Sequence, residues 1–213
     1  MARRRGATGR SGPSGNALVP PRWLRTGPLP GIVTYAAGSL WFRCHKRIDG
    51  PVFFGPGSGI APKYRFDAPA GEYQVLYLGL NYEAAFIETF LRNPKRRSVD
   101  WADLDVRNMA VLTNDAPLQL VKAHGEGLSL LGTTAALSAG GYKQARRYSF
   151  ELWVHPDRAD GLIYSFCHNP NHLCAAIFNR PHAIFSRFRT EPLLSDERRI
   201  RDLLTAHGKS IIK

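Results

Sequence analysis

EYQVLYLGLNYEAAFIETFLRN (72–93) joins two elements of different periodicity. Residues 72–79 are rich in β-branched and aromatic side chains, which favours a β-strand. In residues 81–93 the apolar residues recur at the spacing of one helical face, and Asn81 can cap the first turn. The stretch therefore predicts a strand followed directly by a helix, and it places the acid Glu88 in an apolar part of that helix.

The same reading outward from this stretch gives strands on both sides of it. Apolar and aromatic runs predict strands at 39–46, 108–115, 161–166 and 174–179. Helices are predicted within 127–141, at 142–156 up to Pro156, and at 195–208, where Ser195 is the expected N-cap. The order of these elements predicts one α+β (mixed α/β) unit.

Charge and composition divide the chain into a leader and a domain. The 213 residues are 44% hydrophobic and carry a formal net charge of +12. Residues 1–27 hold six arginines and no acid, so half of the excess charge lies there. We expect residues 1–30 to be a basic, disordered leader in which Trp23 and Leu24 dock locally, and residues 31–213 to form a single domain.

Several classes of protein are excluded by what the sequence lacks. No apolar run reaches the roughly 20 residues that a membrane-spanning helix needs. The basic N-terminal residues are not followed by the apolar segment of a secretory signal. Three cysteines do not indicate a disulfide-stapled secreted fold, so we expect a cytoplasmic protein. Its basic surface would attract anions: nucleic acid, phosphorylated metabolites or an acidic protein.

Four residues are candidates for chemistry. Arg43 in WFRC and Arg65 in YRFD lie among aromatic side chains, and such arginines can clamp phosphates. The alternative is a pair of ordinary surface arginines beside packing aromatics. Tyr77 ends the strand that precedes the helix of Glu88, and an acid in apolar surroundings needs a partner. Glu88 could pair with an arginine or stabilise a developing cation; the alternative is a structural ion pair.

Other patterns indicate no further chemistry. Cys167, His168, His172 and Cys174 lie within eight residues, but their spacing does not match a zinc-binding cysteine pair, so we predict a polar turn and no metal. The chain has neither a Walker phosphate loop nor the GxSxG motif of serine hydrolases. GPGSG (55–59) has the small residues of a flexible phosphate loop, but no helix opens after it.

Taken in order, these segments resemble the RES domain family, toxins of type II toxin–antitoxin systems. The resemblance runs from about Leu40 to Arg180. Arg43 matches the family's aromatic-Arg motif, Arg65 its Arg-aromatic-Asp/Asn motif, and Tyr77 its YLA strand. Ala85-Phe86-Ile87-Glu88 matches the helix that ends in AxxE. Asp160-Gly161-Leu162-Ile163-Tyr164 and then Ala175 to Arg180 match the closing DGxxY…AxFxR pattern.

The sequence departs from the family at its serine. Where many relatives read Ser-Arg-His after the DGxxY strand, this chain reads Phe166-Cys167-His168. Ser165 and Ser149 are the two candidates for the family hydroxyl. If neither fills the role, activity would be weakened or its acceptor changed.

The resemblance implies an ADP-ribosyltransferase-like fold, with central mixed or antiparallel sheets flanked by helices. It also implies cleavage of NAD+ between nicotinamide and ribose, with transfer to phosphate or water. Arg43 and Arg65 would clamp the pyrophosphate. Tyr77, Phe66 or Tyr64 would stack on the rings. Glu88 would stabilise the cationic ribose, with Arg43 and Ser165 or Ser149 as the other catalytic residues. NAD+ is then a substrate, inorganic phosphate is a candidate co-substrate, and no metal is required.

The resemblance further implies a cognate antitoxin of the helix-turn-helix type that blocks the cleft, so that this chain itself would not contact DNA. The oligomeric state stays open, a homodimer included. Two other functions are alternatives. One is a mono-ADP-ribosyltransferase that modifies a protein, for which the same residues would serve. The other is a non-enzymatic nucleic-acid-binding protein that uses the arginine-rich leader, with steeply salt-dependent binding.

Overall fold

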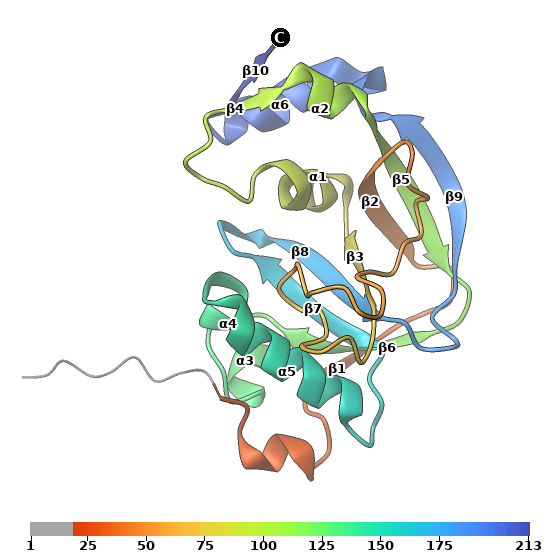
Figure 1. Ribbon diagram of the computed structural model, residues 1–213, viewed down its shortest axis with the longest axis vertical. Helices are drawn as coiled ribbons and strands as arrows, with labels where there is room; N and C mark the ends of the chain where they lie inside the picture. Colours follow the sequence, from red (N-terminus) through yellow and green to blue (C-terminus); the bar gives the residue numbers. More distant parts are fainter. Residues whose placement is uncertain (1–18) are drawn as a thin grey trace, which may run out of the picture.

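A mixed sheet forms the centre of the molecule. The computed structural model describes residues 19–213, and among these eight strands form one sheet in the order β1-β6-β7-β8-β3-β2-β5-β9 (Figure 1). The pair β6–β7 is parallel and the other pairs are antiparallel. The strands are β1 (Ile32–Tyr35), β2 (Leu40–Lys46), β3 (Val75–Gly79), β5 (Arg107–Asn114), β6 (Leu118–Ala123), β7 (Gly161–Phe166), β8 (Asn169–Phe178) and β9 (Phe185–Pro192). This arrangement confirms the predicted α+β class.

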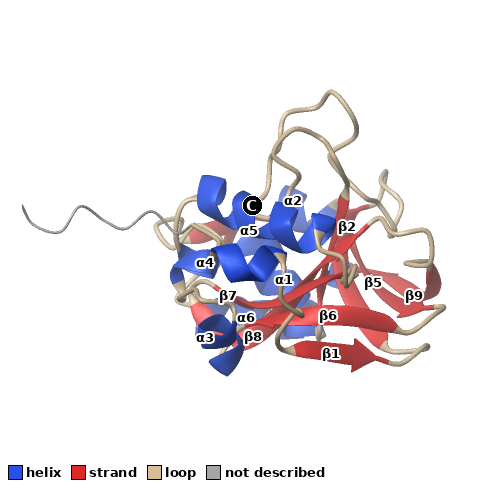
Figure 2. Cartoon of the chain, turned by 90° about the horizontal axis from the view of Figure 1, so that it is seen from below, coloured by secondary structure: helices blue, strands red, loops and turns tan. Residues whose placement is uncertain are grey.

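The helices cover this sheet in two groups. Figure 2 shows α4 and α5 over one face, near β7 and β8. In Figure 1, α2 and α6 lie at the opposite end of the molecule, beside a small parallel pair of β4 and β10. The bounds are η1 (Arg22–Arg25), α1 (Tyr82–Phe90), β4 (Ser98–Asp100), α2 (Trp101–Asp105), α3 (Glu126–Leu130), α4 (Ala136–Ala139), α5 (Tyr142–Val154), η2 (Leu193–Asp196), α6 (Glu197–Ala206) and β10 (Ser210–Ile212).

The sheet divides between β2 and β3. β2 is paired with β5 from Leu40 to Lys46, but with β3 only where Phe42 lies opposite Gly79. Beyond that pair the two strands diverge, and α1 lies beside the opening (Figure 1). At Gly79 an added Cβ would come within 2.4 Å of the Ala85 backbone nitrogen. A residue with a side chain at position 79 would therefore push α1 away from the point where the sheet opens.

Helix starts are the predictions that the structure tests most directly. Asn81 caps α1, since its side-chain oxygen accepts from the Ala84 N–H at 2.7 Å, as predicted. The predicted Ser195 cap is wrong, because the Asp196 carboxylate accepts from the Arg199 N–H at 3.0 Å instead. The single helix predicted within 127–141 is divided into α3 and α4, with Gly132 between them at a φ of +63°.

Buried side chains fill both faces of the sheet. Along β7 the side chains alternate: Leu162 packs with Tyr148 of α5, and Ile163 packs on the other face with Trp41. A third cluster joins Phe86 of α1 to the C-terminal helix. In the described part of the chain, residues 19–213, no helix combines the length and the apolar character that crossing a bilayer requires.

The segment from residue 19 to 30 packs against the domain. Leu24 is 1% exposed and lies in the cluster beneath α5. The Leu29 N–H donates to Asp157 at 2.7 Å, and a His155 ring nitrogen lies 2.9 Å from the Gly27 carbonyl oxygen. The structure thus differs from the boundary predicted at residue 30, although Leu24 docks as expected. Residues 1–18 of the predicted leader lie outside the described residues.

Replacing Leu24 tests this docking. Leu24→Ala should lower the free energy of unfolding by about 2–5 kcal/mol, because it removes a fully buried side chain and leaves a cavity. Ile48→Ala is the control, since Ile48 is 90% exposed and its loss should change stability by less than about 0.5 kcal/mol. Urea unfolding of the full chain measures both. Equal midpoints for the two variants would show that the segment contributes nothing.

Candidate active site

A cleft opens where β2 and β3 diverge. Its volume is about 720 Å³, and its walls come from β2, β3, the first residue of β5, the C-terminal half of α1 and the segment 49–64. Four of the predicted site residues line it: Arg43, Tyr64, Tyr77 and Glu88. Residues that are up to 45 positions apart in the sequence therefore meet at the gap in the sheet.

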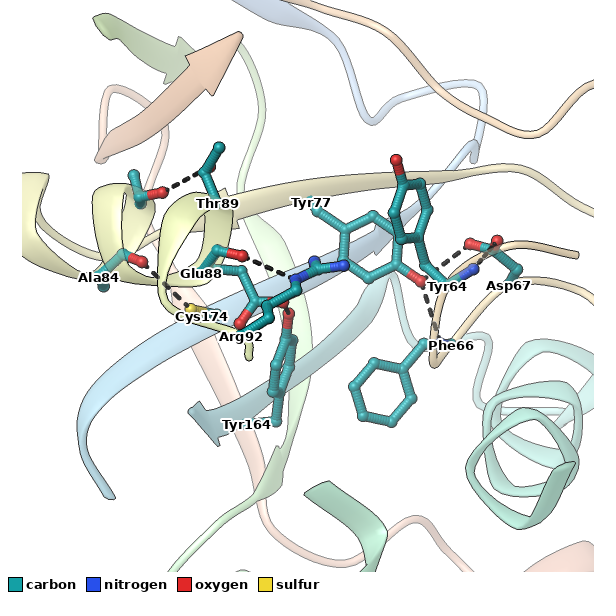
Figure 3. A network of polar contacts seen from close by, with 11 residues as sticks. Tyr64, Phe66, Asp67, Tyr77, Ala84, Glu88, Thr89, Arg92, Tyr164 and Cys174 are labelled. Carbon is teal, nitrogen blue, oxygen red and sulfur yellow. Dashed lines mark hydrogen bonds and ion pairs between the residues drawn. The ribbon is translucent and has the colours of Figure 1, made fainter. Parts of the chain in front are cut away.

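Glu88 is held from two sides. Its Oε1 accepts from Arg92 Nη2 at 2.5 Å and lies 3.5 Å from the Tyr164 hydroxyl, and both side chains point toward it in Figure 3. Arg92 Nε also donates to the Glu88 carbonyl oxygen at 2.7 Å, which fixes the guanidinium against the end of α1. The Glu88 side chain is 18% exposed. One carboxylate is thus oriented at the wall of the cleft and remains open to a ligand.

The surroundings of Glu88 act on its pKa in opposite directions. Burial disfavours the charged form and raises the pKa of Glu88. The guanidinium of Arg92 is the largest opposing influence, followed by the charge of Arg65. The net pKa lies above the ordinary value of a glutamate. Glu88 therefore exchanges its proton nearer to neutral pH than a solvated glutamate does.

Arg43 supplies a cation on the opposite wall. Its Nη1 donates to the Pro51 carbonyl oxygen at 2.9 Å, and its guanidinium lies 6.0 Å from the centre of the Phe53 ring. Burial lowers the pKa of Arg43 to about 10, so the side chain stays charged at neutral pH. One bond to a carbonyl leaves most of its donors available for a ligand.

Asp67 organises the turn that carries the aromatic residues. Its buried carboxylate accepts from the backbone N–H groups of Lys63 and Tyr64 and from the Tyr77 hydroxyl, at 2.8, 2.5 and 2.9 Å. The same hydroxyl accepts from the Phe66 N–H at 3.0 Å (Figure 3). Burial and the Asp67 charge raise the pKa of Tyr77 well above its usual range. The Tyr77 hydroxyl is therefore structural, while its ring and that of Tyr64 face the cleft.

Two expected ligand contacts take other positions. Arg65 does not line the cleft: its Nη1 donates to the Gly140 carbonyl at 2.6 Å, and its guanidinium lies 4.7 Å from the centre of the Tyr142 ring. It is still near enough to Glu88 to lower that pKa. Phe66 is fully buried, with its ring 4.7 Å from that of Tyr164. The prediction that Phe66 stacks on a ligand is wrong, because no face of its ring is open.

Neither predicted serine reaches the cleft. Ser149 is fully buried in α5, where it donates to the Phe66 carbonyl at 2.8 Å and accepts from Tyr73 at 2.7 Å. Ser165 follows Tyr164 on β7, and successive side chains on a strand point to opposite faces. Because Tyr164 points toward Glu88, Ser165 points away from it. The hydroxyl beside Glu88 is that of Tyr164, so the prediction of Ser149 or Ser165 is wrong for this structure.

Sequence reasoning missed three residues that build the site: Asp67, Arg92 and Tyr164. Arg92 lies four residues after Glu88, which is the spacing of an ion pair along a helix, and this signal was available. Tyr164 stood in the DGxxY motif without a role. Asp67 stood in the Arg-aromatic-Asp motif of Arg65 without a role; two of its partners, Lys63 and Tyr64, lie in the same turn, and Tyr77 comes from β3.

The histidines and cysteines of 167–174 do not assemble. Cys174 is fully buried, with its sulfur 3.9 Å from the Ala84 carbonyl oxygen, and His168 lies against the Arg92 carbonyl. Between residues 19 and 213, no three His, Cys, Asp or Glu side chains come close enough to hold a metal ion.

Comparison with known proteins finds a matching family model and a similar fold. The family model described as "RES domain" matches residues 40–201. A chain of the crystal structure of the M. tuberculosis MbcT–MbcA toxin–antitoxin complex is similar in fold, with a TM-score of 0.57 and 12% sequence identity. The similarity covers 78% of this chain and 92% of that one. No curated protein sequence matches the chain.

Removing the Ser149 hydroxyl separates a structural from a catalytic role. Ser149→Ala should lower the free energy of unfolding by about 1–2 kcal/mol, because it breaks buried hydrogen bonds to Phe66 and Tyr73. The NAD+ cleavage that the family resemblance implies, measured well below the lowered melting temperature, should stay at the wild-type level. Ser165→Ala, the control, should change neither quantity. Loss of turnover in a Ser149→Ala protein of unchanged stability would assign catalysis to that hydroxyl.

Proposed function

The chain belongs to the RES domain family, and on that premise we propose that it is the toxin of a toxin–antitoxin pair and cleaves the nicotinamide–ribose bond of NAD+. The observation that carries the proposal is the carboxylate of Glu88, oriented by Arg92 and Tyr164 at the wall of a basic, aromatic cleft. The resemblance in fold to a chain of a toxin–antitoxin complex supports the toxin assignment.

The cleft offers complementary groups for each part of NAD+. Arg43 provides donors and a positive charge for the pyrophosphate. The rings of Tyr64 and Tyr77 lie with their centres 5.4 Å apart and supply apolar faces for a flat base. Because Arg65 is engaged with Gly140, its proposed contact with the pyrophosphate would require it to exchange that bond.

The gap in the sheet also offers backbone groups for an amide. The Arg47 N–H donates to the Val106 carbonyl. Because backbone groups alternate in direction along a strand, the N–H and C=O groups of the odd-numbered residues of β2 point toward β5. The backbone N–H and C=O of Cys44 point the other way, into the opening where β3 no longer pairs with β2. A carboxamide, which both donates and accepts, suits such a strand edge. We propose that nicotinamide binds there.

Bond cleavage needs charge stabilisation more than proton transfer. Nicotinamide leaves with the electron pair of the C–N bond and becomes neutral, while the ribose gains oxocarbenium character. The Glu88 carboxylate would stabilise that positive charge and hold the ribose hydroxyls. Either phosphate or water then bonds to the anomeric carbon; phosphate gives a 1-phosphate, and water gives ADP-ribose with release of a proton.

We further propose that a cognate antitoxin covers the cleft. Phe53 and Ile60 lie at its rim and are 58% and 61% exposed, which leaves apolar surface beside a basic opening. A partner with apolar and acidic side chains would cover both. Substrate and antitoxin would then exclude one another.

The deciding experiment follows nicotinamide release from NAD+ by the purified chain, with and without inorganic phosphate. Phosphate-dependent release with a phosphorylated ADP-ribose product supports a phosphorylase. Release without phosphate supports a glycohydrolase. Absence of release from folded protein in both buffers would contradict NAD+ cleavage. ADP-ribose on lysate proteins, detected by mass spectrometry, would then point to protein modification.

Neutralising Glu88 should remove activity but not the fold. Glu88→Gln is expected to lower turnover by about 10²–10³-fold, since it removes the charge that stabilises the transition state. Glu197→Gln is the matched control, because Glu197 forms the same i,i+4 pair with Arg201 on a distant, exposed helix. Circular dichroism checks folding. An unfolded Glu88→Gln protein, or one with normal turnover, would show that Glu88 is not the catalytic carboxylate.

The pH dependence of turnover should reflect the raised pKa of Glu88. The ionised form is required, so activity falls as the pH drops through this pKa, at a higher pH than for an ordinary glutamate. Arg92→Met removes the main group that favours ionisation and should move the acid limb of kcat/KM to still higher pH, with partial restoration by Arg92→Lys. If the acid limb does not move in Arg92→Met, it does not arise from the ionisation of Glu88.

A further inference from the structure

Two cations meet at the edge of the cleft away from Glu88. Lys46 ends β2 and Arg107 begins β5, and the two residues lie directly opposite in the strand register. Both line the cleft. The next pair, Arg47 and Val106, is joined by a backbone hydrogen bond of 2.8 Å. Lys46 and Arg107 therefore form the non-hydrogen-bonded type of antiparallel pair, in which side chains approach most closely.

Neither cation has an acidic partner within residues 19–213. The neighbouring Arg47 pairs with Asp105 at 3.5 Å. Among the described residues the side chains of Lys46 and Arg107 form no ion pair and no hydrogen bond; the one side-chain contact to Lys46 is that of the His45 ring with its backbone carbonyl, at 2.8 Å. The Arg107 guanidinium lies 5.3 Å from the centre of the Phe90 ring, and its Nε is buried without a hydrogen-bond partner. A buried charged donor without a partner is rare in folded proteins.

Two like charges directly opposite on adjacent strands repel one another. The repulsion is relieved when an anion lies between them, and a phosphate dianion matches both charges and the vacant donors. We propose that Lys46 and Arg107 form a second phosphate-binding subsite of the cleft, in addition to Arg43. This inference rests on the proposed function in one respect: the ligand that fills the rest of the cleft is a dinucleotide.

The subsite lies apart from the reacting atoms. Phe90, beside Arg107, follows Glu88 by two residues, which turns its side chain about 200° around the axis of α1. Glu88 is held by Arg92 and Tyr164, which do not contact Arg107. A phosphate at Lys46 and Arg107 would thus be a recognition group rather than the acceptor. The 2′-phosphate of NADP+ has this chemistry, and free orthophosphate is the other source.

Calorimetric titration of the full chain distinguishes these sources. NAD+ and NADP+ are titrated into the Glu88→Gln protein, in which slowed turnover leaves them intact during the titration, and orthophosphate is titrated into the wild type. We expect NADP+ to bind on the order of ten-fold more tightly than NAD+, the effect of about one charge-assisted hydrogen bond. Adding Arg107→Gln or Lys46→Gln should remove this preference. Arg47→Gln, the control, removes an equal charge from the next residue and should keep it.

Each outcome decides the proposal. A preference for NADP+ that Arg107→Gln abolishes supports a nucleotide phosphate. Equal binding of the dinucleotides, with orthophosphate binding lost in Arg107→Gln, supports free phosphate. Ligand binding that neither Lys46→Gln nor Arg107→Gln alters would overturn the subsite. Lys46 is exposed, so Lys46→Gln remains informative if Arg107→Gln fails to fold. Phosphate binding without any nicotinamide release would contradict the proposed reaction but retain the subsite.

Discussion

The single pairing of Phe42 with Gly79 is the constraint on which the site depends. It keeps β2 and β3 in one sheet at the last residue of β3, while the rest of β3 separates from β2. A fully paired sheet would leave no cleft at this point, and two separate sheets would not hold Arg43 and Glu88 across from one another. Gly79 meets a second requirement at the same point, because the start of α1 passes closer to the strand than a side chain would allow.

Arginines in and around the cleft divide into those that bind backbone carbonyls and those that keep donors free for a ligand. Arg65 and Arg146 both donate to backbone carbonyls, and they tie the turn at 62–67 to the region of α4 and α5. Arg43 makes one such bond, and Arg107 makes none. The excess positive charge of the chain is thus partly consumed by structure. The positive charge that remains in the cleft exceeds the two negative charges of a pyrophosphate. A further phosphate group on the ligand would balance it.

Much of the fold could be predicted from local patterns, and the failures have physical causes. β3, α1, β5 and β7 have strong composition and spacing, and all were predicted. β9 was missed because FSRFRTEP has exposed charged residues and ends at a proline, as an edge strand can. The cap of α6 was assigned to Ser195 because it is as suitable a residue as the adjacent Asp196. β1 was missed as well, because it is short and half exposed. Strands of this kind are defined by their partners rather than by their own sequence.

The site shows the same division between local and tertiary information. Residue type identified Arg43 and Glu88, because a charged side chain among apolar neighbours needs a partner or a ligand. It did not reveal which side chains are open. Arg65, Phe66 and Asp67 are adjacent in sequence, yet one binds carbonyls, one is sealed in the core and one anchors a turn. A serine predicted from the family pattern proved to brace that same turn from α5, and a tyrosine took the place beside Glu88. The AxxE motif therefore marks a glutamate that lies at the cleft, whereas the hydroxyl beside Glu88 depends on which side chains of β7 point toward α1.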